Sequence, residues 1–188
     1  EVLDSVLVVK ALAQFERTLV SGNSRFDNHT LEQRGLPTNG PHSLSPAEKR
    51  GLDLFMSERK GDCFHCHGNP RNPLWTNNAF KNNGLDVVPD SGLAEITGNP
   101  SDIGKFKTPS IRNLVFTAPY MHDGRFQTLE EVVDFYMDDV QFSSVNLDPV
   151  MLKDRDLTPS ERQDLIAFMK TLTDSSFVKN PAFTDPNK

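Results

Sequence analysis

The sequence predicts an all-α domain whose helices are joined by long irregular loops. Three segments begin with the same helix-start signal, a capping hydroxyl followed three residues later by glutamate, at Ser45, Thr128 and Thr158. Residues 68–110 are instead rich in Asn, Gly and Pro and show no sustained period for helix or strand. At 188 residues and 36% hydrophobic, the chain is expected to form one domain, or one domain with an extension.

The first 44 residues are predicted to form an N-terminal helix and an irregular connecting segment. Residues 2–20 carry apolar side chains at helical spacing, and this helix begins so near the first residue that little room is left for a cap. Such a start suggests a chain that once continued upstream. Residues 21–44 contain several Gly, Asn and Pro and are expected to be irregular, which leaves residues 45–188 as the main domain.

Three helices are expected within residues 45–188. Two have proline directly after the capping residue, as in Ser45-Pro46 and Thr158-Pro159, which suits the first helical position. The first of these helices leads directly into a pair of cysteines. The last has an apolar stripe typical of a closing helix packed on a core, formed by Leu165, Phe168, Met169 and Leu172.

The cysteine pair lies in the motif Cys63-Phe64-His65-Cys66-His67, the CxxCH signature of covalent haem c attachment. Two thiols on one helical turn can each bond one porphyrin vinyl group, and His67 then becomes the proximal iron ligand. A zinc site or a thioredoxin-like site is the alternative, but no second ligand cluster and no βαβ pattern accompany the motif. His65 is expected to face solvent. A haem would also explain the long loops, because it supplies a packing partner for them.

Composition limits the partners and the compartment. The formal charge of −6 and the pI near 5.3 argue against nucleic acid as a partner. No apolar run is long enough to span a membrane. Because haem c is attached outside the cytoplasm, the chain is expected to be periplasmic after removal of an export signal.

The second axial ligand of the iron is predicted from the helix that begins after Thr128. Tyr136 shares an apolar face with Leu129, Val132 and Val133, whereas Met137 lies at the edge of this face. Spacing therefore favours Tyr136 over Met137 as the haem-facing residue. A core tyrosine with a bonded hydroxyl remains the alternative for Tyr136.

Two further segments carry a family resemblance. FKTPSIRN at 106–113 and TAPYMHDG at 117–124 resemble the C-terminal domain of bacterial di-haem cytochrome c peroxidases and of MauG, with support from FERTL at 15–19, LSPAEKRG at 44–51 and the helix at 157–172. The resemblance implies a cytochrome c-like fold around one haem c, bound through Cys63, Cys66 and His67. The family's distal ligand is tyrosine in MauG and methionine in the peroxidases, and its position falls on Tyr136, with Met137 as the alternative.

The resemblance also implies contacts around the haem. Family members hold calcium near the domain interface, and the matching backbone carbonyls belong to Thr117 and Pro119. Trp75 is expected to pack near the haem, with a place in the loop core as the alternative, and His122 is expected to bond within the haem pocket. A basic set could pair with the haem propionates or be solvated, namely Lys105, Lys107, Arg112 and Arg125.

These features predict the electron-transfer half of a di-haem peroxidase or MauG-like oxidase. The chain would relay electrons to, or store an oxidising equivalent for, a peroxide-reacting haem on a second haem-bearing domain or chain, and it holds no predicted catalytic residue itself. A redox protein donor or a protein substrate would be the other partner. The alternative is a stand-alone mono-haem cytochrome c with histidine and methionine ligands, and a zinc module is a remote third hypothesis.

Overall fold

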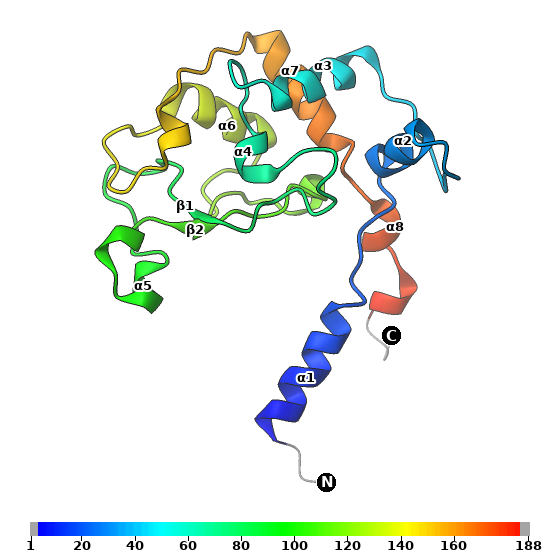
Figure 1. Cartoon of the computed structure of the whole chain (residues 1–188), viewed down its shortest axis with the longest axis horizontal. Helices are drawn as coiled ribbons and strands as arrows, with labels where there is room; N and C mark the ends of the chain where they lie inside the picture. The colour runs from blue at the N-terminus through cyan, green and yellow to red at the C-terminus, as the bar shows by residue number, and fades with distance from the viewer. Residues whose placement is uncertain (1–3, 185–188) are drawn as a thin grey trace.

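Helices α3 (Pro46–Met56) and α7 (Pro159–Lys170) pack against each other and lie side by side in Figure 1. The structure is a computed structural model that describes residues 4–184. The two helices are in tight contact at Gly51, where a Cβ atom would overlap the backbone carbonyl of Asp164. Glycine is therefore required at this crossing for steric reasons.

The described residues are mostly helical, and the predicted all-α class is confirmed. Besides α3 and α7, the α-helices are α1 (Ser5–Glu16), α2 (Arg25–Gln33), α4 (Phe64–His67), α5 (Ala94–Thr97), α6 (Leu129–Asp134) and α8 (Ser175–Val178). Short 3₁₀ turns are η1 (Pro100–Asp102), η2 (Leu114–Phe116), η4 (Pro149–Leu152) and η5 (Pro181–Phe183), and η3 (Phe135–Asp139) is a π-helix that continues α6. The strands of the described part, β1 (Phe80–Lys81) and β2 (Phe106–Lys107), pair antiparallel.

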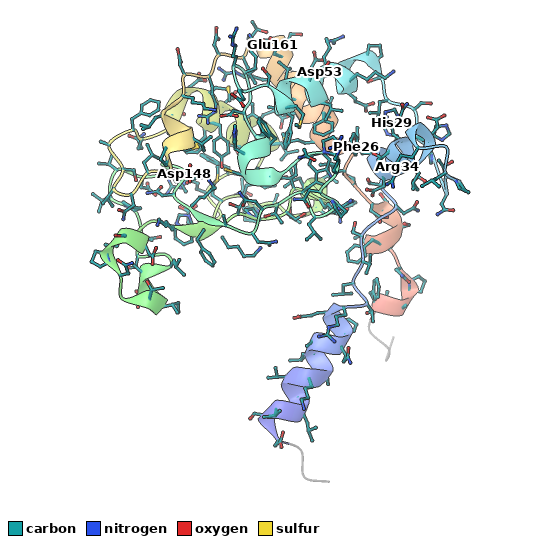
Figure 2. All side chains as sticks on the ribbon, viewed as in Figure 1. Phe26, His29, Arg34, Asp53, Asp148 and Glu161 are labelled. Atoms are coloured by element: carbon teal, nitrogen blue, oxygen red, sulfur yellow. The ribbon has the colours of Figure 1, made fainter. Side chains whose placement is uncertain are left out.

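The core is built on an aromatic cluster at the α3–α7 crossing. Phe55 of α3 and Phe168 of α7 meet edge to face, with ring centroids 5.4 Å apart. Trp75 packs on both rings, and Phe26 of α2, labelled in Figure 2, contacts Trp75 and Phe168. The core therefore includes Phe26, which lies before position 44. The division of the chain into an N-terminal segment, 1–44, and a main domain, 45–188, stays a prediction.

The three predicted helix starts are confirmed. Ser45, Thr128 and Thr158 each accept a hydrogen bond from the backbone of the glutamate three residues later, and that glutamate bonds back to the capping residue. This reciprocal arrangement satisfies two backbone donors that would otherwise have no partner. Two of these helices form the central packing, and the third leads to the π-helix.

The N-terminal region differs from the prediction in two ways. Helix α1 spans Ser5–Glu16 rather than 2–20, and it does have a cap, because the Asp4 side chain accepts from the backbone of Leu7. Residues 2 and 3 lie outside the described part. The segment 21–44, expected to be irregular, contains α2, which begins with a capping box between Ser24 and Asp27. The prediction missed this signal because the third position holds aspartate rather than glutamate.

The segment 68–110, predicted to lack a sustained period, contains only the short elements β1, α5, η1 and β2 between its loops, and it is well anchored. The Thr76 hydroxyl donates to the carbonyl of Thr108 over 2.7 Å, and the Ser110 hydroxyl donates to the carbonyl of Leu74 over 2.6 Å. These bonds join the segment after α4 to the segment after β2. Among residues 4–184, no helix is both long and apolar enough to cross a membrane.

Candidate haem site

The two cysteines lie at the start and the third position of the short helix α4. The backbone of His67 donates to the carbonyl of Cys63 over 3.0 Å, which closes this single turn around both thiols. Neither cysteine forms a disulfide, and both are half-buried. Burial raises the pKa of Cys63 to about 12 and also raises that of Cys66. Both thiols are therefore protonated at neutral pH.

His67 is oriented by a carbonyl group from a distant part of the chain. Its Nδ1 atom lies 3.1 Å from the carbonyl oxygen of Pro109. A carbonyl can only accept, so Nδ1 carries the proton and Nε2 has a free lone pair, as in metal-binding histidines held by an outer hydrogen bond. Burial lowers the pKa of His67 to about 4, which keeps the ring neutral at physiological pH. A neutral, oriented imidazole is what an axial ligand requires.

Tyr136 lies in the π-helix η3, a type of helix that occurs frequently at functional sites. Its hydroxyl oxygen is 3.2 Å from Nδ2 of Asn83, which donates to it. Burial raises the pKa of Tyr136 to about 12, and negative charge on Cys66 and Cys63 would act in the same direction. The phenol therefore lies within electrostatic reach of both thiols, beside the CxxCH motif.

Met137, the alternative to Tyr136, packs against the hydrophobic core cluster, as Cys63 also does. Both side chains are half-buried, so burial does not distinguish between them as haem-facing residues. Ligation of iron by either residue stays a prediction.

These residues fit a covalent haem better than a bare metal ion. They offer two protonated thiols on one turn, an imidazole with a free Nε2 and a half-buried phenol from another element. In the described part of the chain, no three His, Cys, Asp or Glu side chains are grouped so that they could hold a metal ion. The zinc hypothesis therefore has no ligand set among residues 4–184.

A buried charge cluster next to the motif was missed from the sequence. The Asp62 carboxylate is 0% exposed, and it accepts from His65 Nδ1 at 2.5 Å. Lys153 Nζ lies 2.9 Å from its Oδ2 without the geometry of a hydrogen bond, and Arg155 lies 3.9 Å away. His65 is solvent-exposed, as predicted. No sequence signal identifies this cluster, since residues 62 and 153–155 are brought together only by the fold.

Trp75 lies in the protein core, which was the alternative location predicted for it. It is 1% exposed, and its ring contacts Phe26, Phe55 and Phe168. The backbone of Ile111 donates to the Trp75 carbonyl over 3.3 Å, which ties this core to the matched 106–113 segment. Packing of Trp75 on a haem edge stays a prediction.

The basic residues proposed as propionate partners are mostly paired with carboxylates of the chain. Arg112 binds both oxygens of Asp27, at 2.6 and 2.8 Å. Arg125 binds Asp86 and Asp123, and Lys105 binds Asp102. The exposed Lys107 has no carboxylate partner among the described residues. Contact with haem propionates stays a prediction for all four.

The remaining predicted positions lie in the loop after η2. Thr117 and Pro119 are exposed and flank the Ala118–Pro119 peptide, which is cis. Calcium binding by their carbonyls stays a prediction. His122 stacks on Phe106 with ring centroids 3.7 Å apart, and its Nε2 is 3.2 Å from Asp90. Its recorded contacts are thus with these two residues rather than with those around the cysteines.

The sequence is similar to those of several known redox proteins. No protein-family model matches the chain. A cytochrome c peroxidase, IdrP1, of Pseudomonas sp. (strain SCT) is 34% identical over 197 residues, covering 87% of this chain and 48% of the relative. The methylamine utilization protein MauG of Methylorubrum extorquens is 37% identical over 172 residues, covering 88% of this chain and 43% of the relative.

Solved structures show the same relationship. A MauG-like protein associated with microbial copper homeostasis superimposes with a TM-score of 0.81 and 36% identity, covering 100% of this chain and 62% of that one. The di-haem peroxidase BthA of Burkholderia thailandensis gives a TM-score of 0.65 and 26% identity. The match covers 83% of this chain and 47% of the BthA chain. The chain spans about half the length of the curated relatives that it matches. With its CxxCH turn and its cytochrome c-like fold, the chain belongs to the family of di-haem cytochrome c peroxidases and MauG.

Proposed function

We propose that this chain is the electron-transfer half of a di-haem peroxidase or MauG-like oxidase. It would carry one haem c on Cys63 and Cys66 and act with a peroxide-reacting haem on a second domain or chain. The observation that carries this proposal is an oriented His67 in the CxxCH turn together with a half-buried Tyr136, whose hydroxyl is close enough to both thiols for their charge to raise its pKa. The match to about half of each di-haem relative supports the need for a second haem-bearing part.

The haem would supply one-electron redox chemistry at its iron. The protein would contribute thioether attachment through the two cysteines and a neutral proximal imidazole, oriented by the carbonyl of Pro109. Tyr136 would contribute an oxygen ligand. Because an anionic oxygen donor favours oxidised iron, it suits a site that stores an oxidising equivalent rather than one that is readily reduced.

The deciding experiment compares Tyr136→Phe with Met137→Leu in the haem-loaded protein. We expect Tyr136→Phe to change the ferric absorption and resonance Raman spectra, while Met137→Leu leaves them unchanged. An unchanged ferric spectrum in Tyr136→Phe would remove Tyr136 from the ligand set. A denaturing intact-mass spectrum of native material would then show whether a second haem-bearing part exists, on the same polypeptide or on another.

A stand-alone electron carrier with histidine and methionine ligands is the second candidate. One contact favours it: the Met121 sulfur lies 3.7 Å from Nδ2 of Asn83, the atom that also donates to Tyr136. A thioether is thus near the phenol, although it is not that of Met137. The carrier function would require ready reduction by mild donors and a single haem in the native protein. Location in the periplasm, where haem c is attached, is part of both proposals.

A further inference from the structure

The side-chain amide of Asn83 contacts a phenol oxygen and a thioether sulfur at once. Its Nδ2 atom is 3.2 Å from the hydroxyl oxygen of Tyr136 and 3.7 Å from the sulfur of Met121. Both distances are within hydrogen-bonding range for oxygen and sulfur acceptors, respectively. Asn83 is therefore the immediate polar neighbour of the phenol oxygen, and it comes from a different part of the chain.

The backbone around Asn83 is fixed by its neighbours. The amide of the buried Asn82 donates to Ser144 Oγ at 3.0 Å and to the carbonyl of Val145 at 2.7 Å. The Asn82 side-chain oxygen accepts from the backbone of Gly84 at 2.8 Å, which makes a tight turn at Asn83. The Gly84 carbonyl in turn accepts from the backbone of Gln141 at 2.8 Å.

These bonds attach the Asn83 turn to the segment that directly follows the π-helix. The ion pair between Lys81 Nζ and Asp148 Oδ2, at 2.7 Å, strengthens the attachment, and Asp148 is labelled in Figure 2. The backbone of Asp148 also donates to the carbonyl of Asn82 over 3.0 Å. Since the turn and the π-helix are held by the same segment, the position of the Asn83 amide relative to Tyr136 is determined by the fold.

We propose that Asn83 is a positioning residue for the distal ligand: its amide holds the Tyr136 oxygen in place and donates a hydrogen bond to it. This inference rests on the proposed function, in which Tyr136 binds the haem iron. A hydrogen bond to an anionic oxygen is charge-assisted and stronger than one to a neutral phenol. It withdraws electron density from the oxygen, so it weakens donation to the iron and raises the reduction potential.

The test uses two substitutions in the haem-loaded full chain. Asn83→Leu removes the donor and all polarity, and Asn83→Asp keeps the shape of the side chain but has no amide donor. Met121→Leu is the matched control, because it removes the other contact of the amide without touching the phenol. The readouts are the ferric tyrosinate bands in absorption and resonance Raman spectra and the reduction potential, with haem content and thermal unfolding measured as checks of folding.

We expect both Asn83 variants to shift the tyrosinate charge-transfer band to longer wavelength and to lower the reduction potential, while Met121→Leu stays close to the parent protein. A purely structural role would instead give a parent-like spectrum in the isosteric Asn83→Asp. That outcome, or an equal shift in Met121→Leu, would overturn the inference.

The spectrum of the parent protein separates this inference from the proposed function. If the parent shows no tyrosinate bands, or if Tyr136→Phe leaves its spectrum unchanged, the ligand assignment is wrong and the role of Asn83 falls with it. If Tyr136→Phe removes the bands but the Asn83 variants retain parent-like bands and potential, only the role of Asn83 is wrong.

Discussion

The Nδ1 atom of His67 and the carbonyl oxygen of Pro109 lie 3.1 Å apart, although 42 residues separate them in the chain. This contact joins the CxxCH turn to the 106–113 segment that resembles the peroxidase family. It assigns the proton of the imidazole to Nδ1 and leaves Nε2 available. The family motif is thus in direct contact with the haem-attachment motif, and its proline supplies the group that orients the ring.

The first prediction concerns this imidazole. In the haem-loaded protein, His67→Gly should keep both thioether bonds but lose the parent absorption spectrum, because the proximal ligand is gone. Added free imidazole should restore much of the spectrum by entering the space left by the ring. His65→Gly is the control, since the exposed His65 is expected to leave the spectrum unaltered. A parent-like spectrum in His67→Gly would show that this histidine does not bind the iron.

The second prediction concerns the crossing of the two central helices. Gly51→Ala should destabilise the protein by about 1–3 kcal/mol, as overpacking usually does, because the new Cβ would meet the Asp164 carbonyl. Gly22→Ala is the matched control, since a Cβ at Gly22 would meet no atom within 4 Å. Urea unfolding of the haem-loaded variants would measure both changes. Equal midpoints for the two variants would contradict the close approach.

The third prediction concerns the pH dependence of the Asp27–Arg112 pair. Burial alone would raise the pKa of Asp27, but hydrogen bonds from Arg112 and Ser24, together with the charge of Arg112, outweigh it, and the pKa lies below its ordinary 3.8. Because the folded-state pKa is lower than that of the unfolded chain, the pair stabilises the fold above the ordinary pKa. This stability is lost as the pH falls through the folded-state value.

Two variants test this pair by unfolding at several pH values. Arg112→Ala should cost about 3 kcal/mol at neutral pH, because it leaves a largely buried carboxylate without its partner. Asp27→Asn should flatten the acid limb of the stability curve, since the titrating group is gone. The exposed pair of Asp138 with Arg162 offers a comparison, and Asp138→Asn should change stability much less. An unchanged acid limb in Asp27→Asn would show that other carboxylates control it.

The fourth prediction concerns the buried charge cluster at Asp62. Asp62→Asn should destabilise the protein by about 3 kcal/mol, because it removes the carboxylate that neutralises Lys153 and the buried Arg155. Amide exchange should rise first in residues 150–157, which the cluster holds against the CxxCH turn. Asp154→Asn, at an exposed position without a recorded ion pair, is the control. Parent-like exchange in that segment would contradict this role for the cluster.

Local signals predicted the starts of three helices well, because each start depends on a few adjacent residues. The capping boxes at Ser45, Thr128 and Thr158 are examples, and the box at Ser24 could have been found with a broader rule for the third position. The apolar stripe of 129–136 correctly indicated that Leu129 and Val133 are buried, whereas the order that it predicts for Tyr136 and Met137 stays a prediction.

Long-range features of the site could not be predicted in the same way. The approach of Arg112 to Asp27 and of Arg155 to Asp62 depends on loops whose paths have no periodic pattern. The same is true of Asn83, whose position depends on bonds from Asn82 to residues more than sixty positions later. Such contacts follow from how the loops are anchored, and composition alone carries no information about that.

The π-helix after α6 gives the distal side of the site an unusual dependence on backbone winding. A π-turn closes its hydrogen-bonded ring with one residue more than an α-turn, so side chains beyond it are rotated relative to a regular helix. Deleting one residue from 135–139 is expected to restore regular winding and to change the directions in which Tyr136 and Met137 face. One of these adjacent residues carries a hard oxygen donor and the other a soft sulfur donor, so helix geometry as well as residue identity would decide which atom is presented to a metal.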